Sequence, residues 1–112
     1  MQTVVETPVF LRRAEKLLTR EEHDGLITCL AAYPLSGDEI PGTGGVRKIR
    51  FAARGKGKSG GVRVIYYFYD RDVPIYALMI YGKNERADLT SEQRKAWVDA
   101  VNPVWKTFST TQ

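Results

Sequence analysis

The feature that most constrains the fold is a series of three β-strand patterns separated by turn-forming residues. Between residues 46 and 52, Ile49 and Phe51 alternate with basic residues, which is the period of a strand with one buried and one solvated face. Residues 62–69 and 75–81 are rich in β-branched and aromatic residues, and the polar break DRDVP between them is typical of a hairpin. We therefore expect three consecutive antiparallel strands.

A short strand and two helices are predicted before these strands. Residues 3–6 have the composition of a strand. Thr7, followed by a proline at the first helical position, predicts the cap of a helix that ends near residue 18. Thr19 and Glu22 have capping-box spacing, and apolar residues follow at helical spacing to about residue 33, before Pro34.

The remaining segments predict a loop and a last helix. Residues 35–45, LSGDEIPGTGG, have the Gly, Pro, Asp and Ser density of a surface loop. Capping-box spacing recurs at residues 90–93, so a C-terminal helix is expected to begin near Ser91 and to end or kink at Pro103. The length suits a single domain over residues 1–112. The expected fold is α+β: an N-terminal strand, two helices, a three-stranded antiparallel meander that completes the sheet, and a C-terminal helix.

The composition excludes several kinds of active site. Cys29 and His23 are the single cysteine and the single histidine, so one chain cannot build a disulfide, a cysteine-rich zinc site or a histidine triad. We expect Cys29 to pack within its helix and His23 to be solvated. GKGKS is not a phosphate-binding P-loop, because the required first glycine falls at Ala52 and a strand follows. No metal or cofactor is expected.

A cytoplasmic location is also expected. No apolar run approaches the roughly 20 residues that a membrane helix needs, and the start, MQTVVETPVF, lacks the basic and then apolar build of a secretory signal. We expect no association with a membrane.

Positive charge is concentrated in the second part of the chain. The net charge is +4, with four Lys or Arg against seven Asp or Glu in residues 1–40, and thirteen against six in residues 41–112. Residues 47–63 contain no acidic residue. Such a stretch is favourable when a polyanion compensates its self-repulsion, although glycine-spaced lysines also fit a solvated loop. Its basic residues are Arg47, Lys48, Arg50, Arg54, Lys56, Lys58 and Arg63.

The period of the strands predicts a basic, aromatic face on the sheet. With Ile49, Phe51, Val64, Tyr66, Phe68, Leu78 and Ile80 turned inward, the residues turned outward are Lys48, Arg50, Arg63, Tyr67, Met79, Tyr81 and Lys83. Cations on this face would hold phosphates while tyrosines stack on exposed bases, as in single-stranded RNA binding. RNA carries its own nucleophile, the ribose 2′-hydroxyl, so cations could also promote cleavage. Lys48 or Lys83 is then the candidate base. Tyr66, Tyr69 and Tyr76 are expected in the core or at its rim.

The order of elements, together with RKIRFA, the basic glycine-rich loop, VRVIYYFYD and IYGKNERADLT, resembles the RelE/HigB toxins of bacterial type II toxin–antitoxin systems, particularly the HigB branch. The resemblance covers nearly the whole chain. It implies a metal-independent endoribonuclease that cuts messenger RNA on the ribosome through attack of the 2′-hydroxyl and so inhibits translation and growth. It also implies a cognate antitoxin, often with a helix-turn-helix domain. The toxin itself would then contact operator DNA only indirectly, through this antitoxin.

The resemblance also implies roles for single residues. Lys48 and Arg50 match the two basic strand positions, Arg63 matches the transition-state arginine, and Lys83 matches the basic position after the last strand. The next arginine of RelE is replaced by Asn84, and its late tyrosine has no counterpart near Leu89, so Tyr67 or Tyr81 would stack on the base. The expected substrate-binding residues are Arg47, Arg54, Lys56, Lys58, Tyr67, Tyr81, Asn84 and Arg86.

Two other functions remain open. A gyrase-inhibiting toxin of the ParE kind would share this fold without needing the basic strand positions. A non-catalytic module that binds RNA or the ribosome would use the same charges as a nuclease, so the sequence does not separate binding from cleavage.

Overall fold

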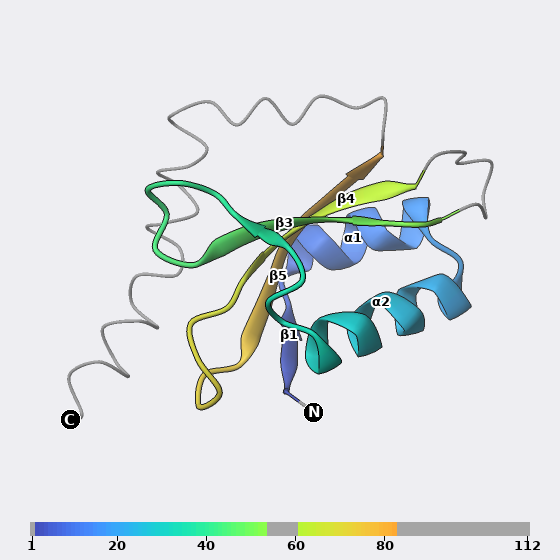
Figure 1. Ribbon diagram of the computed structural model, residues 1–112. Helices are drawn as coiled ribbons and strands as arrows, with labels where there is room; N and C mark the ends of the chain where they lie inside the picture. Colours follow the sequence, from blue (N-terminus) through green and yellow to red (C-terminus); the bar gives the residue numbers. More distant parts are fainter. Residues whose placement is uncertain (1, 54–60, 83–112) are drawn as a thin grey trace.

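In the part of the chain that the structure describes, two helices pack on one face of a five-stranded mixed sheet (Figure 1). The computed structural model describes residues 2–53 and 61–82, and the expected helix near Ser91 lies outside them. The α+β class is confirmed. Along the described chain the elements are β1 (Val4–Glu6), α1 (Pro8–Leu17), α2 (Arg20–Ala32), β2 (Asp38–Glu39), β3 (Val46–Phe51), β4 (Val62–Tyr67) and β5 (Ile75–Gly82).

Both helices begin at the predicted caps. The Thr7 hydroxyl accepts a hydrogen bond from the backbone N–H of Phe10 at 3.2 Å, and proline occupies the first turn of α1. In α2, Glu22 donates its N–H to the Thr19 hydroxyl at 3.2 Å, and the Glu22 carboxylate accepts the N–H of Thr19 at 2.9 Å. These bonds satisfy N–H groups that have no partner within the helix. The structure describes no helix that is both long and apolar enough to cross a membrane.

The sheet has the strand order β1-β5-β4-β3-β2. Strands β3, β4 and β5 form the expected antiparallel meander, and β1 pairs in parallel with β5, with Val4 opposite Ile75. The segment predicted as a loop between residues 35 and 45 contains the edge strand β2, which pairs with β3. A strand of two residues is too short to show a period in sequence.

Buried side chains occupy both faces of the sheet. The helix-side cluster consists of Phe10, Ala14, Leu17, Leu18, Leu26, Leu30, Ala53, Val62, Val64, Tyr66, Ile75, Ala77 and Ile80. The outer cluster, on the face turned away from the helices, consists of Ile40, Val46, Ile65, Tyr67, Leu78 and Tyr81, with Tyr69, Tyr76 and Met79 packed against it. The outer face is therefore partly buried, whereas the sequence predicted an open one.

A β-bulge in β5 explains one wrong orientation. Tyr66 pairs with Ala77 and Ile65 pairs with Met79, so Leu78 has no partner on β4. An extra residue interrupts the alternation of side chains between faces. Leu78 consequently belongs to the outer cluster, although it was predicted to face inward with Ile80.

Candidate nucleic-acid interface

Arg50, Arg63 and Tyr81 form a row across three strands. Arg50 lies opposite Arg63 in the β3–β4 register, and Arg63 lies opposite Tyr81 in the β4–β5 register. Directly opposite residues of antiparallel strands share a face, with their Cβ atoms about 4.5–5.5 Å apart. Two cations that are direct neighbours repel each other, so this row favours an anion placed against both guanidinium groups.

Lys48 extends this cationic surface along β3. It lies two residues before Arg50 and therefore on the same face, and both side chains are exposed, while Arg63 is half-buried. Within the described part of the chain, no ion pair is found at these three side chains. The outer face thus brings together three of the four residues that the sequence predicted as catalytic. We call Lys48, Arg50 and Arg63 the cation group.

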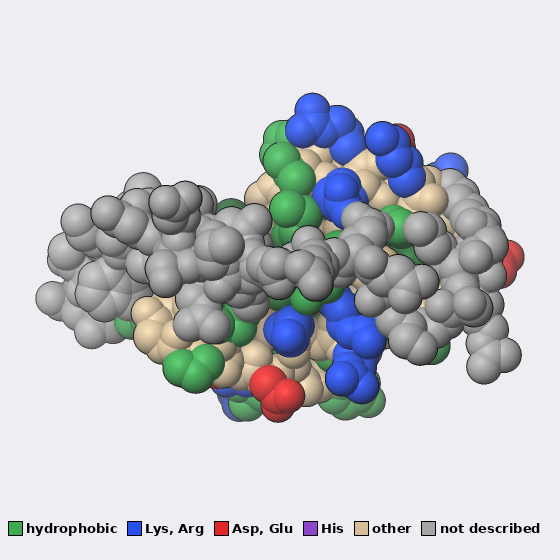
Figure 2. All heavy atoms as spheres, turned by 90° about the horizontal axis from the view of Figure 1, so that it is seen from above, with side chains coloured by type: hydrophobic (Ala, Val, Ile, Leu, Met, Phe, Trp, Pro, Cys, Tyr) green, Lys and Arg blue, Asp and Glu red, His purple; other side chains and the backbone are tan. Residues whose placement is uncertain are grey.

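The side of the molecule seen in Figure 2 carries several groups of Lys and Arg side chains, interspersed with hydrophobic ones and with few acidic side chains in view. The other predicted site residues lie outside the described part of the chain. They are Arg54, Lys56, Lys58, Lys83, Asn84 and Arg86.

The two tyrosines expected to stack on a base are on the predicted face but are buried. Tyr67 is 1% exposed and Tyr81 is 8% exposed. Burial raises the pKa of Tyr67 to about 12, with the nearby Tyr69 and Asp70 adding to it. Burial also raises the pKa of Tyr81, against the opposing effect of the Arg63 charge. Rings this enclosed offer little surface to a base, which corrects the role predicted for them.

Other aromatic side chains on the outer face keep accessible surface. Tyr69 and Tyr76 are half-buried and pack against the outer cluster, and Tyr76 lies opposite Tyr67. Their position at the rim of the core agrees with the sequence-based expectation. The sequence analysis assigned stacking to Tyr67 and Tyr81 instead, because period two alone does not show which tyrosine of a strand is covered.

Arg47 lies on the other face from the cation group. It is opposite Tyr66, which belongs to the helix-side cluster. Its Nη1 donates a hydrogen bond to the Gly37 carbonyl at 2.7 Å, and its buried Nε has no hydrogen-bond partner among the described residues. Arg47 was predicted to bind substrate, but this geometry holds its side chain against the chain that leads into β2.

The hydroxyl of Tyr66 also bonds to the backbone before β2. We call the hydrogen bonds of Tyr66 and Arg47 to this backbone the polar brace. The Tyr66 hydroxyl donates a hydrogen bond to the Pro34 carbonyl at 2.7 Å and accepts the N–H of Gly37 at 2.9 Å. Burial raises the pKa of Tyr66, although the Gly37 N–H and the charge of Arg47 act in the opposite direction. Together, Tyr66 and Arg47 fix the backbone immediately before Asp38.

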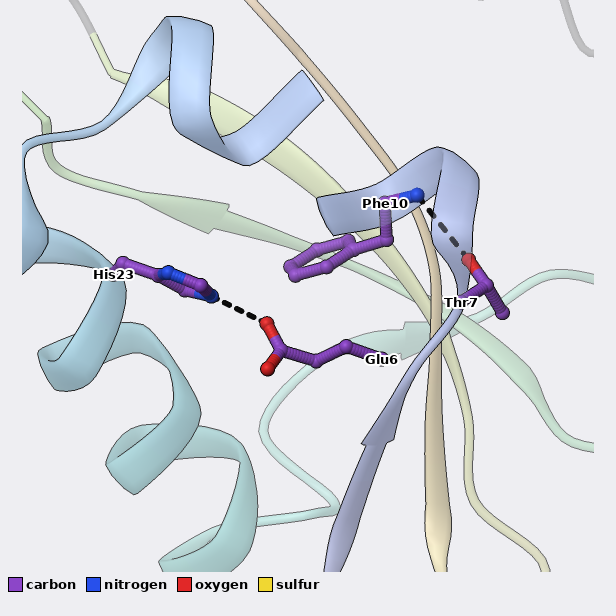
Figure 3. A network of polar contacts seen from close by, with 4 residues as sticks. All are labelled: Glu6, Thr7, Phe10 and His23. Atoms are coloured by element: carbon purple, nitrogen blue, oxygen red, sulfur yellow. Dashed lines mark hydrogen bonds and ion pairs between the residues drawn. The ribbon is translucent and has the colours of Figure 1, made fainter. Parts of the chain in front are cut away.

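His23 is bound to a carboxylate, whereas the sequence predicted a solvated side chain. Its Nε2 contacts the Glu6 carboxylate, so α2 is joined to the end of β1 (Figure 3). The ring centroid of Phe10 lies 6.2 Å from that of His23. The side chains of His23 and Glu6 are 23% and 22% exposed. No sequence pattern could indicate this pair, because Glu6 and His23 belong to different elements.

The described residues contain no group of three or more His, Cys, Asp or Glu side chains able to hold a metal ion. Cys29 is a free, half-buried thiol in α2.

No protein-family model matches the chain. Chemically, the outer face offers hydrogen-bond donors with positive charge, next to partly exposed aromatic rings.

Proposed function

We propose that this protein is a metal-independent endoribonuclease of the RelE/HigB kind, the toxin of a toxin–antitoxin pair. The observation that carries the proposal is the position of Arg63 directly opposite Arg50, on the same face as Lys48. Three positive side chains on adjacent strand positions match the charge of a phosphodiester that gains a further negative charge as it reacts. The resemblance of the sequence to RelE/HigB toxins points to the same chemistry.

Cleavage would proceed by attack of the ribose 2′-oxygen on the adjacent phosphorus. The P–O5′ bond breaks, which leaves a 2′,3′-cyclic phosphate and a 5′-hydroxyl. In this reaction the guanidinium groups of Arg50 and Arg63 donate hydrogen bonds to the non-bridging phosphate oxygens, and Lys48 adds a point charge. Because the charge on these oxygens grows in the transition state, such donors accelerate the chemical step, and removing one typically costs about 10²–10³ in rate.

The partners follow from the same proposal. The substrate is messenger RNA on the translating ribosome, and partly exposed rings such as Tyr76 provide stacking surface for its bases. A cognate antitoxin would silence the toxin and contact operator DNA through a helix-turn-helix domain, as the resemblance to RelE/HigB toxins implies.

The test is cleavage of messenger RNA by an Arg63→Ala variant. After brief expression, primer extension on a defined transcript should show discrete new ends with the native protein and a loss of about 10²–10³ in their yield with the variant. The fold should survive, because Arg63 is only half-buried. Arg12→Ala, at an exposed position of α1, is the matched control and should cleave normally.

Two outcomes would contradict the proposal. A folded Arg63→Ala protein with full cleavage and toxicity would remove the cation group from the mechanism. Intact transcripts with the native protein would exclude a nuclease. In that case, broken DNA would indicate a gyrase-inhibiting toxin, and intact DNA would indicate a module that only binds RNA or the ribosome.

A further inference from the structure

The edge strand β2 brings a carboxylate next to the cation group. Asp38 lies directly opposite Lys48 in the β2–β3 register. It therefore shares the outer face with Lys48, and its diagonal neighbour on that face is Arg50, two residues further along β3. The side chain of Asp38 is exposed. No sequence pattern pointed to this residue, because β2 was not predicted.

Asp38 is the one described acidic residue that the register places beside the cation group. Glu39 is opposite Arg47 and so turns to the other face. Asp70 and Asp72 lie in the turn between β4 and β5, and Glu6 on β1 is bound to His23. The remaining described acids are on α1 and α2: Glu15, Glu21, Glu22 and Asp24.

The backbone before Asp38 is held in place by a close fit. The Gly37 N–H and carbonyl are bonded to Tyr66 and Arg47, at 2.9 Å and 2.7 Å. A Cβ at Gly37 would lie 2.7 Å from the Tyr66 hydroxyl oxygen and 2.9 Å from the Lys48 carbonyl oxygen, so this position has no room for a side chain. After β2, Ile40 donates its N–H to the Val46 carbonyl at 2.8 Å. Bonds on both sides thus position a strand of only two residues.

Proton removal is the step that the cation group does not supply. Arginine and protonated lysine side chains are hydrogen-bond donors without an acceptor, whereas an ionised carboxylate is an acceptor. We propose that Asp38 is the general base that removes the proton from the attacking 2′-hydroxyl, an inference that rests on the ribonuclease function proposed above. This proposal differs from the expectation drawn from the sequence, in which Lys48 or Lys83 was the candidate base.

The 2′-O–H proton moves to the Asp38 carboxylate while the 2′-oxygen forms its bond to phosphorus and the P–O5′ bond breaks. The 5′-oxygen takes a proton from water, and Asp38 returns its proton to solvent. Arg50 and Arg63 stabilise the phosphate oxygens throughout, so the base and the charge-stabilising groups occupy neighbouring positions on β2, β3 and β4.

The pH dependence of the rate reports on this assignment. The groups that face Asp38 from β3, the one strand that pairs with β2 in the described sheet, are Lys48 directly opposite and Arg50 on the diagonal. A general base acts only in its ionised form, so a rate that depends on a carboxylate base falls at acid pH.

The experiment measures single-turnover cleavage of a short messenger RNA bound to ribosomes, from acid to neutral pH. Asp38→Asn should lower the rate at neutral pH by about 10²–10⁴, the usual contribution of a general base, and should abolish the fall at acid pH. Glu39→Gln is the matched control, because it changes the neighbouring carboxylate on the opposite face; it should keep the native rate and pH profile. In Asp38→Ala, added formate should restore part of the lost rate, since a small carboxylate can enter the vacated space.

Several results would overturn the assignment. A native cleavage rate in Asp38→Asn would show that Asp38 does not remove the proton. The same conclusion would follow if Asp38→Asn were slower but its rate still fell at acid pH as in the native protein, and formate did not restore Asp38→Ala. Circular dichroism and thermal unfolding identify a variant that fails to fold, and the formate measurement on Asp38→Ala then decides. If the native protein leaves the RNA uncut, the proposed function itself is wrong, and the inference about Asp38 falls with it.

Discussion

Replacing Tyr66 with phenylalanine tests the polar brace that positions β2. The side chain is 0% exposed, and its hydroxyl makes two hydrogen bonds to backbone groups, with the Gly37 N–H and the Pro34 carbonyl. Tyr66→Phe keeps the ring and removes only the hydroxyl. The packing of the helix-side cluster is therefore retained, and the measured effect reports on the two lost bonds.

The magnitude follows from those two bonds. Each is worth about 1 kcal/mol net, and a buried backbone group left without a partner costs roughly 1–3 kcal/mol. We expect Tyr66→Phe to lower the free energy of unfolding by about 2–3 kcal/mol. With an unfolding entropy of about 2.1 cal/mol/K per residue over 112 residues, each kcal/mol lowers Tm by about 4 °C, so Tm should fall by roughly 8–12 °C.

The assay is thermal and urea unfolding followed by far-UV circular dichroism. Tyr33→Phe is the matched control, because Tyr33 is 68% exposed and loss of its hydroxyl should change stability by less than about 0.5 kcal/mol. If Tyr66→Phe were as stable as Tyr33→Phe, the hydroxyl of Tyr66 would not brace the chain before β2. Asp38 would then not be held in a fixed position by Tyr66.

Four other features of the structure can be tested in the same way. Burial raises the pKa of Tyr67 from 10.0 to about 12, so its phenol stays protonated in the folded state at pH values where the unfolded chain ionises. The free energy of unfolding should therefore fall as pH rises from 10 to 12. In urea unfolding, Tyr67→Phe should show a shallower fall over this pH range. Gly37→Ala forces a Cβ to within 2.7 Å of the Tyr66 hydroxyl oxygen and should cost about 1–3 kcal/mol in urea unfolding; native stability would disprove the close fit. Glu6→Ala removes the carboxylate that contacts His23 and should lower the free energy of unfolding by about 1 kcal/mol in urea unfolding; native stability would contradict a bond that joins α2 to β1. Arg50→Ala should weaken RNA binding and reduce the salt slope of log K by about 1 in filter binding; an unchanged slope would exclude a phosphate contact.

The predicted orientation of side chains was correct where strands were regular. Lys48, Arg50 and Arg63 lie on one face, as alternation in β3 and β4 required. Alternation failed in β5, where the bulge at Leu78 adds a residue between Ala77 and Met79. A bulge is set by the pairing of two strands, so the sequence of one strand does not reveal it.

The sequence by itself determined the elements whose signals are local. The caps at Thr7 and Thr19, the alternating residues of β3 and the turn before β5 act within a few residues of each other, so they could be recognised along the chain. Tertiary structure alone decided what depends on contacts between distant segments: the parallel pairing of β1 with β5, the edge strand that places Asp38 opposite Lys48, and the burial of Tyr67 and Tyr81. The physical reason is that strand pairing and burial are properties of two or more segments in contact. A pattern within one segment indicates the direction of a side chain, but the neighbouring segments determine which residues that side chain contacts and how far it is buried.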